Sequence, residues 1–133
     1  MVLVDSSIWI FAEHNKIPVA SLLPQDELVA TCPMIMQEVL RGTSNAAHYD
    51  RTRRMLLDTE VLDESTPFER FEEAAKLFLA CRDDGITPRT SVDCLVAATA
   101  IAHGIPLLHD DRDFENIKRV LPLRTLRPTR SST

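Results

Sequence analysis

Short apolar runs alternate along this chain with longer segments of helical pattern. Runs typical of strands occur at residues 2–4, 29–31, 60–62, 107–108 and 123–126, the last at a sheet edge. A strand covered on both faces shows a continuous apolar run, as residues 2–4 do, because helices pack on both sides of a parallel sheet. Strands that alternate with helices indicate an α/β fold. We therefore predict a central, mainly parallel sheet flanked by helices in three layers.

Capping residues indicate where the helices begin and end. Helical segments are predicted from Pro33 to Gly42, Ser44 to Leu57, Thr66 to Gly85, Ser91 to Gly104 and Phe114 to Val120. Thr66 and Glu69 flank Pro67 in the pattern of a capping box, whose side chains bond the free backbone N–H groups of a first turn. Ser91 and Asp113 are expected to cap the two later helices.

The size and composition of the chain fit one domain in a reducing compartment. Its 133 residues, 44% of them hydrophobic, suffice for a single core. Three cysteines without a C-x-x-C pair indicate neither a disulfide framework nor a zinc site. No apolar run approaches the roughly 18 residues of a membrane span. We expect a cytoplasmic protein with one domain over residues 1–128 and a disordered tail over 129–133.

The net charge of −5 counts against a nucleic-acid enzyme, because binding a phosphate backbone usually requires a basic surface. Its distribution weakens that objection. Residues 112–133 hold six Lys and Arg against two Asp and Glu, and Arg51, Arg53 and Arg54 form a second basic cluster. Solvated surface explains both groups as well, so charge alone decides neither for nor against RNA.

Four acidic side chains are expected near one edge of the predicted sheet. Asp5 follows the first strand, and Asp111 follows the strand at 107–108. Asp93 lies in the first turn of a helix that begins near that edge. In parallel sheets, functional sites form outside the carboxyl ends of the strands. Glu38 lies between apolar residues of an earlier helix, where a carboxylate is least expected if that face is buried.

Each acid taken alone has a structural explanation, as a turn residue, a helix cap or a solvated side chain. Together they have a chemical consequence, because carboxylates brought together repel one another unless cations neutralise them. Hard oxygen ligands suit Mg²⁺ or Mn²⁺ rather than zinc. The pattern therefore predicts a divalent-cation centre.

Four stretches around these acids form a recognisable series. They are Val4-Asp5-Ser6-Ser7-Ile8-Trp9-Ile10, Met36-Gln37-Glu38-Val39-Leu40-Arg41-Gly42, Ser91-Val92-Asp93-Cys94-Leu95-Val96-Ala97-Ala98 and Leu107-Leu108-His109-Asp110-Asp111-Arg112-Asp113-Phe114. In order and spacing they resemble the motifs of PIN-domain ribonucleases and, within that superfamily, of the VapC toxins of bacterial toxin–antitoxin pairs. The resemblance spans nearly the whole chain and implies a PIN-like fold.

The resemblance also implies roles for individual residues. The acidic quartet that holds one or two divalent ions in the family corresponds to Asp5, Glu38, Asp93 and Asp111. Of these, Asp5 and Asp93 match direct metal ligands, and Ser7 matches a hydroxyl that supports the quartet. Asp111 is preferred to Asp113 as the fourth acid, because Asp113 has an alternative role as a helix cap, and Asp113 is taken as a second supporting residue. Arg89 and Arg112 are candidate contacts to a substrate phosphate, with a plain surface role as the alternative.

The activity implied is hydrolysis of RNA with Mg²⁺ or Mn²⁺, through an activated water that leaves 5′-phosphate and 3′-hydroxyl ends. Relatives pair with a small VapB-type antitoxin that covers the active-site groove, and they commonly form homodimers. A catalytically silent PIN-fold module that binds RNA or protein, and a DNA nuclease, remain alternatives. Ser6 and Ser7 count against a receiver domain and an aspartate-nucleophile phosphatase, each of which would carry a second acid there.

Overall fold

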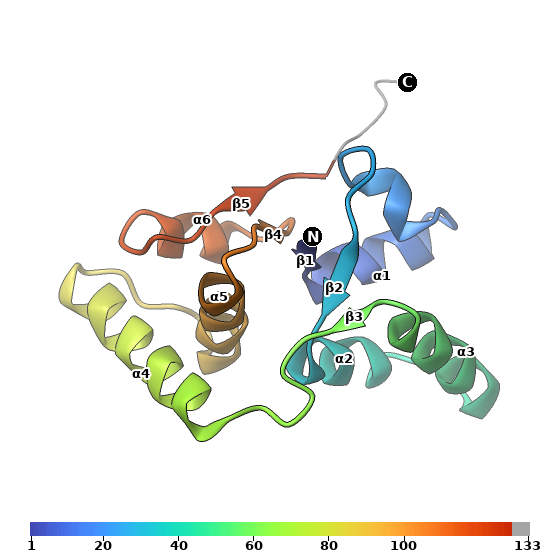
Figure 1. Cartoon of the computed structure of the whole chain (residues 1–133), viewed down its shortest axis with the longest axis horizontal. Coiled ribbons are helices and arrows are strands. Elements are labelled where there is room, and N and C mark those ends of the chain that lie inside the picture. Colours follow the sequence, from blue (N-terminus) through green and yellow to red (C-terminus); the bar gives the residue numbers. More distant parts are fainter. Residues whose placement is uncertain (129–133) are drawn as a thin grey trace.

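A computed structural model describes residues 1–128 and places a five-stranded sheet among six α-helices (Figure 1). The strands are β1 (Val2–Val4), β2 (Val29–Thr31), β3 (Glu60–Val61), β4 (Leu107–Leu108) and β5 (Thr125–Leu126). The helices are α1 (Ser6–His14), α2 (Pro33–Leu40), α3 (Ala46–Leu57), α4 (Phe68–Asp83), α5 (Ser91–His103) and α6 (Arg112–Lys118), with a short 3₁₀ helix η1 (Val19–Leu22). The tail expected at 129–133 lies outside the described residues.

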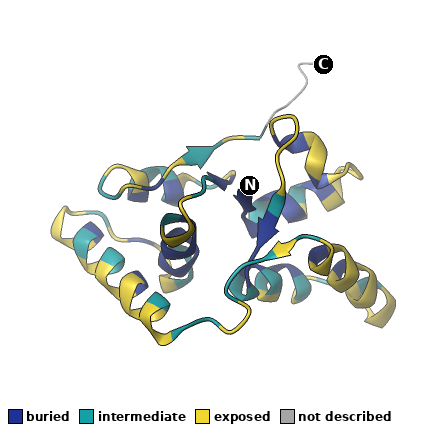
Figure 2. Cartoon of the chain, in the orientation of Figure 1, coloured by how far each residue is buried: buried dark blue, intermediate teal, exposed yellow. Residues whose placement is uncertain are grey.

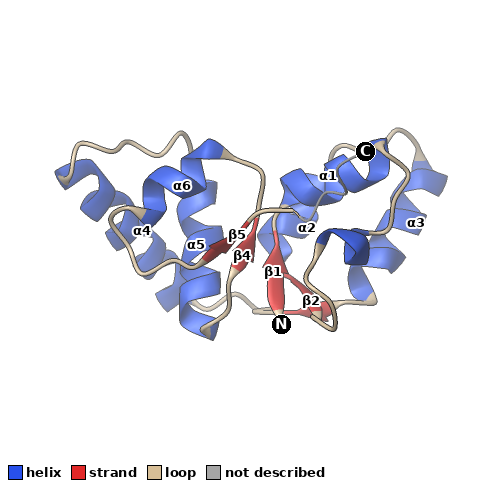
Figure 3. Cartoon of the chain, turned by 90° about the horizontal axis from the view of Figure 1, so that it is seen from above, coloured by secondary structure: helices blue, strands red, loops and turns tan. Residues whose placement is uncertain are grey.

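All neighbouring strands run parallel, in the order β3-β2-β1-β4-β5. Helices α1, α2 and α3 lie on one side of the sheet and α4, α5 and α6 on the other (Figure 3). The predicted three-layer α/β fold is therefore confirmed. From β1 the chain steps outward through β2 to β3, then crosses back to β4 on the other side of β1. Ligands bind at such a reversal, outside the carboxyl ends of the two central strands.

The apolar runs form the core, as their composition predicts. Residues 2–4 of β1 and 107–108 of β4 are fully buried. Helix α5 is buried at every position from Cys94 to Ala100, because it is apolar around its whole circumference. The outer faces of α3 and α4 are largely exposed instead (Figure 2). No helix within residues 1–128 is long and apolar enough to cross a membrane.

The predicted caps of α4 and α5 are wrong. Pro67 occupies the cap position of α4 without a side-chain bond, and the Thr66 hydroxyl donates to the Asp63 carbonyl at 2.9 Å instead. That hydroxyl closes the preceding turn and is therefore not available to the helix. At α5, Thr90 is the cap residue and Ser91 is the first helical residue. Local sequence does not distinguish these arrangements, because Thr and Ser hydroxyls serve turns and caps alike.

Candidate active site

Asp5 lies where β1 ends and α1 begins. Its backbone N–H donates to the carbonyl of Leu108 in β4 at 2.9 Å, so the ends of the two central strands are fixed together. The Asp5 side chain is 4% exposed and caps α1, accepting from the Ser7 backbone N–H at 3.2 Å and from the Ser7 hydroxyl at 2.6 Å. Burial raises the pKa of Asp5, and the bonds from Ser7 oppose that rise.

Ser7 also joins Asp5 to the loop that follows β4. Its hydroxyl oxygen accepts from the Asp110 backbone N–H at 3.3 Å while its proton is donated to Asp5. One side chain therefore ties together two segments that are more than a hundred residues apart in the sequence. The role of Ser7 in supporting the quartet stays a prediction.

Three carboxylates converge beside Asp5. Oxygen atoms of Asp93, Asp111 and Asp113 all lie within 4.8 Å of one another. Within residues 1–128, Asp93 Oδ2 is buried and has no hydrogen-bond partner. Burial, followed by the charges of Asp111 and Asp113, raises the pKa of Asp93 to about 7. Near neutral pH the Asp93 carboxyl is therefore only partly ionised.

The predicted cap of α6 is wrong. Asp111, not Asp113, caps α6, and its Oδ1 accepts from the Asp113 backbone N–H at 2.9 Å. Asp111 has the extended backbone that a cap residue requires, whereas Asp113 lies within the first turn of the helix. Both carboxylates nevertheless belong to the cluster. The choice of Asp111 over Asp113 as the fourth acid stays a prediction.

Glu38 approaches the same site from α2. Its Oε1 accepts from the Ser6 hydroxyl at 3.3 Å. Burial and then the charge of Asp5 raise the pKa of Glu38, while Arg41 opposes the rise. Ser6 was not predicted as a site residue, and only its place beside Ser7 in the first motif could have suggested it.

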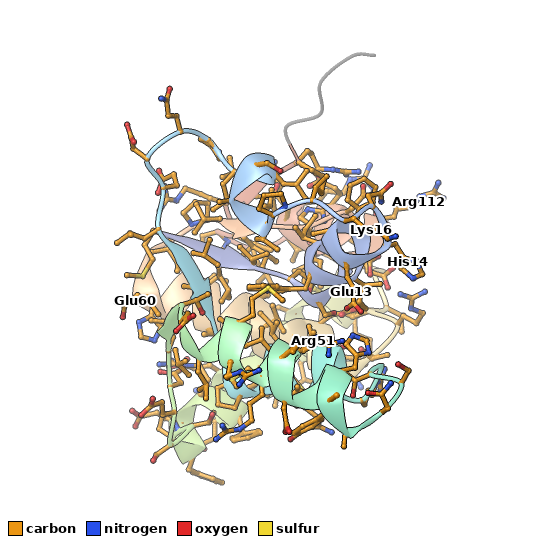
Figure 4. All side chains as sticks on the ribbon, turned by 90° about the vertical axis from the view of Figure 1, so that its right-hand side faces the viewer. Glu13, His14, Lys16, Arg51, Glu60 and Arg112 are labelled. Carbon is orange, nitrogen blue, oxygen red and sulfur yellow. The ribbon has the colours of Figure 1, made fainter. Side chains whose placement is uncertain are left out.

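The two candidate arginines differ in position. Arg89 Nη2 lies 3.3 Å from Asp111 Oδ2, and its Nε lies 3.3 Å from Asp113 Oδ2. The Arg89 side chain is 71% exposed, so solvent weakens both ion pairs. Arg112, in contrast, is exposed, and its side chain projects outward from the surface (Figure 4).

His109 supports the acidic loop from beneath. It is fully buried, packs against Phe114 with ring centroids 5.2 Å apart, and accepts at Nδ1 from the Asp111 backbone N–H at 3.0 Å. Burial lowers the pKa of His109, so the imidazole is neutral and its proton resides on Nε2. His109 therefore positions Asp111.

The donor set fits a divalent cation. All of the converging atoms are carboxylate oxygens, which are the ligands that Mg²⁺ and Mn²⁺ prefer. The unpartnered Asp93 oxygen and the raised pKa values of Asp5, Glu38 and Asp93 show a site that gains from added positive charge. An acidic cluster at the reversal point of a parallel sheet defines the class: an α/β protein whose candidate site has the ligands that a divalent cation prefers.

Comparison with known proteins agrees with that class. Residues 2–120 match the PIN domain, so this chain belongs to the PIN domain family. It is 32% identical over 130 residues to ribonuclease VapC11 of Mycobacterium tuberculosis, and the aligned region covers 93% of this chain and 96% of that protein. It is 34% identical over 96 residues to ribonuclease VapC6 of the same species, covering 71% and 74% of the two chains.

Solved structures show the same fold. The chain superposes on VapBC2 of Rickettsia felis bound to a promoter DNA fragment with a TM-score of 0.73, at 19% identity, covering 97% of this chain and 100% of that one. It superposes on VapC20 of M. tuberculosis, a toxin that cleaves the sarcin–ricin loop, with a TM-score of 0.65, also at 19% identity, covering 93% and 99%.

Proposed function

We propose that this protein is a metal-dependent endoribonuclease that acts as the toxin of a toxin–antitoxin pair. The observation that carries the proposal is the convergence of Asp93, Asp111 and Asp113 beside buried Asp5. Clustered acids of this kind suit phosphodiester hydrolysis with a divalent cation. The 32% identity to a protein named as a ribonuclease, over almost the full length of both chains, supports RNA as the substrate.

We assign Asp5, Glu38, Asp93 and Asp111 to an Mg²⁺ or Mn²⁺ centre, with Asp113 as a supporting or additional ligand. When bound, such a cation makes a water molecule acidic enough to attack near neutral pH and stabilises negative charge on the phosphate and the leaving oxygen. Asp93 fits the role of a direct ligand, because one of its buried oxygens has no partner within residues 1–128.

The side chains around these acids fix their geometry. Ser7 holds Oδ2 of Asp5, and the neutral imidazole of His109 holds the backbone of Asp111. Ser6 fixes Oε1 of Glu38, and we assign Oε2 to orienting the attacking water. The new bond joins the water oxygen to phosphorus, and the bond from phosphorus to the 3′ oxygen breaks. The 3′ oxygen takes up a proton, so the products carry 5′-phosphate and 3′-hydroxyl ends.

Arg89 is assigned to the substrate phosphate. Its guanidinium lies at the exposed rim of the cluster, on Asp111 and Asp113. A phosphate that enters with its cation would take over this guanidinium, because Arg binds phosphate and carboxylate with the same planar donors. Arg112, which projects from the surface, is assigned a weaker contact further along the RNA.

The partner part of the proposal depends on relatives. VapBC2 of R. felis and VapBC-1 of Haemophilus influenzae are solved toxin–antitoxin structures with the same fold. We therefore propose a VapB-type antitoxin as the partner, and a homodimer as the functional form. A hollow of about 440 Å³ between α4 and α5, lined by Phe71, Phe78, Leu79 and Val92, offers apolar surface for such contacts.

The test is cleavage of total cellular RNA by purified protein with Mg²⁺, with EDTA, and as the Asp5→Asn variant, followed by mapping of 5′ ends. Asp83→Asn, the same change at an exposed carboxylate at the end of α4, is the control. We expect cleavage by wild type and control with Mg²⁺ only, and growth arrest on expression of the same two proteins. Cleavage that survives EDTA or Asp5→Asn would refute the mechanism, and equal cleavage of single-stranded DNA would favour a less specific nuclease.

A further inference from the structure

A second hollow lies between α2 and α3 and has no part in the site described so far. It measures about 540 Å³ and is open to solvent. It is lined by Gln37 and Arg41 at the end of α2, by Tyr49 and Arg53 of α3, and by the apolar Met36 and Leu40. Within each of the two polar pairs the residues are four apart, and residues at that spacing share one face of a helix. Both helices thus contribute polar groups to a lining that is otherwise apolar.

The two arginines of this hollow are available to a ligand. Within residues 1–128 neither Arg41 nor Arg53 makes an ion pair, whereas Arg70, Arg89 and Arg127 do. Tyr49, which lines the same hollow, is 41% exposed. Guanidinium groups without an ion pair and an exposed aromatic side chain in one hollow match what a nucleotide presents, namely phosphate charge and a flat base.

The hollow lies close to the acidic site along α2. Arg41 follows Glu38 by three residues, about one helical turn, and residues at that spacing lie on the same side of a helix. Arg41 is therefore next to a proposed active-site carboxylate. An RNA strand with its scissile phosphate at the acids would therefore pass Arg41 as it leaves.

We propose that the hollow between α2 and α3 binds the single-stranded RNA next to the cleaved bond, with Arg41 and Arg53 on phosphates and a base stacked on Tyr49. This inference rests on the proposed ribonuclease function and assigns a place on the protein to the nucleotides that flank the cleaved bond. Binding by stacking requires an unpaired base, so single-stranded RNA and loops fit the surface and a continuous duplex does not.

The chain offers a matched control on the same helix. Arg51 lies two residues before Arg53, and side chains at that spacing point to nearly opposite sides of a helix. It lines a different hollow with Glu13 of α1, and the two side chains appear together in Figure 4. Arg51 and Arg53 are both exposed, so either can be replaced by glutamine without disturbing the core.

The experiment measures fluorescence anisotropy of a short labelled single-stranded RNA with protein carrying Asp5→Asn throughout, so that no cleavage occurs. In this parent, Tyr49→Ala is expected to weaken RNA binding by about 10-fold, because it removes a base-stacking contact. Tyr49→Phe keeps the aromatic ring and is expected to keep the affinity. Arg53→Gln is expected to reduce the salt dependence of log K by about 0.7, and Arg51→Gln to leave it unchanged. Circular dichroism checks that each variant is folded.

The outcomes separate this inference from the proposed function. RNA binding by the parent with no effect of Tyr49→Ala or Arg53→Gln would overturn the inference and leave the ribonuclease proposal intact. Equal losses from Arg51→Gln and Arg53→Gln would also overturn it, because they would show a diffuse charge effect. If Arg53→Gln weakens only the binding of a protein partner, the hollow belongs to that partner. No RNA binding by the parent and no cleavage by wild type would overturn both.

Discussion

Ionisation of Asp93 lowers the free energy of unfolding when no cation is bound, and this loss can be measured. Its carboxylate lies among those of Asp111 and Asp113, with one oxygen buried and unpartnered within residues 1–128. The pKa of Asp93 is about 7 in the folded chain, against an ordinary value of 3.8. Ionised Asp93 therefore destabilises the fold, and Asp93→Asn should stabilise it when no cation is present.

The size of the effect follows from linkage between protonation and folding. Each pKa unit corresponds to about 1.36 kcal/mol, so the full shift would be worth about 4 kcal/mol. Asp93 is only partly buried, and solvent screening reduces the expected gain to about 2 kcal/mol, or roughly 5–10 °C in Tm.

The pH dependence has a definite sign. Below pH 3.8 the Asp93 carboxyl is protonated in the folded and unfolded chains alike and costs nothing. As the pH rises from there to about 7, only the unfolded chain ionises freely, so the wild type loses stability relative to Asp93→Asn. Above about pH 7 the difference between the two proteins stays constant.

The assay is thermal unfolding of wild type, Asp93→Asn and the surface control Asp83→Asn in EDTA, between pH 4 and 8, and then in Mn²⁺. The gain from Asp93→Asn should appear at pH 8, shrink toward pH 4, and fall or reverse in Mn²⁺, which stabilises the wild type by binding it. A gain that is the same at every pH, or a loss at pH 8 in EDTA, would refute the reasoning about repulsion.

Three further predictions use other contacts of the structure. Arg89→Gln removes a positive charge that lies 3.3 Å from both Asp111 and Asp113. Mn²⁺ binding, measured by calorimetry, should tighten by about 5-fold, which equals about 1 kcal/mol for a partly solvated charge. An unchanged Kd would show that Arg89 does not compete with the cation for these carboxylates. Ser7→Ala removes the 2.6 Å bond to Asp5 and should lower the free energy of unfolding in urea by about 1 kcal/mol while also reducing RNA cleavage. Asp63→Asn weakens the link from the loop before α4 to Arg70 and His103 and should cost about 1–3 kcal/mol with cleavage unchanged, so a selective loss of cleavage would contradict a purely structural role.

Local chemistry made much of the fold predictable from sequence. The strands at 2–4 and 107–108 were recognisable because a strand buried on both faces needs an uninterrupted apolar run. Helix α5 was recognisable for a similar reason, and Gly104 ends it with the left-handed backbone that glycine adopts readily. In each case the residues of the element itself and its immediate neighbours in sequence determine the secondary structure.

The sequence predicted that acids meet at one edge of the sheet, but it did not predict which acid caps a helix or what each one contacts. Asp111 was separated from Asp113 by a helix-cap argument, yet the fold gives the cap to Asp111 and keeps both in the cluster. Ser6 and Glu38 meet across 32 residues, and nothing local to either predicts the bond. Such contacts depend on the order of strands in the sheet and on how helices pack against it. They involve residues far apart in the chain, so tertiary structure alone decides them.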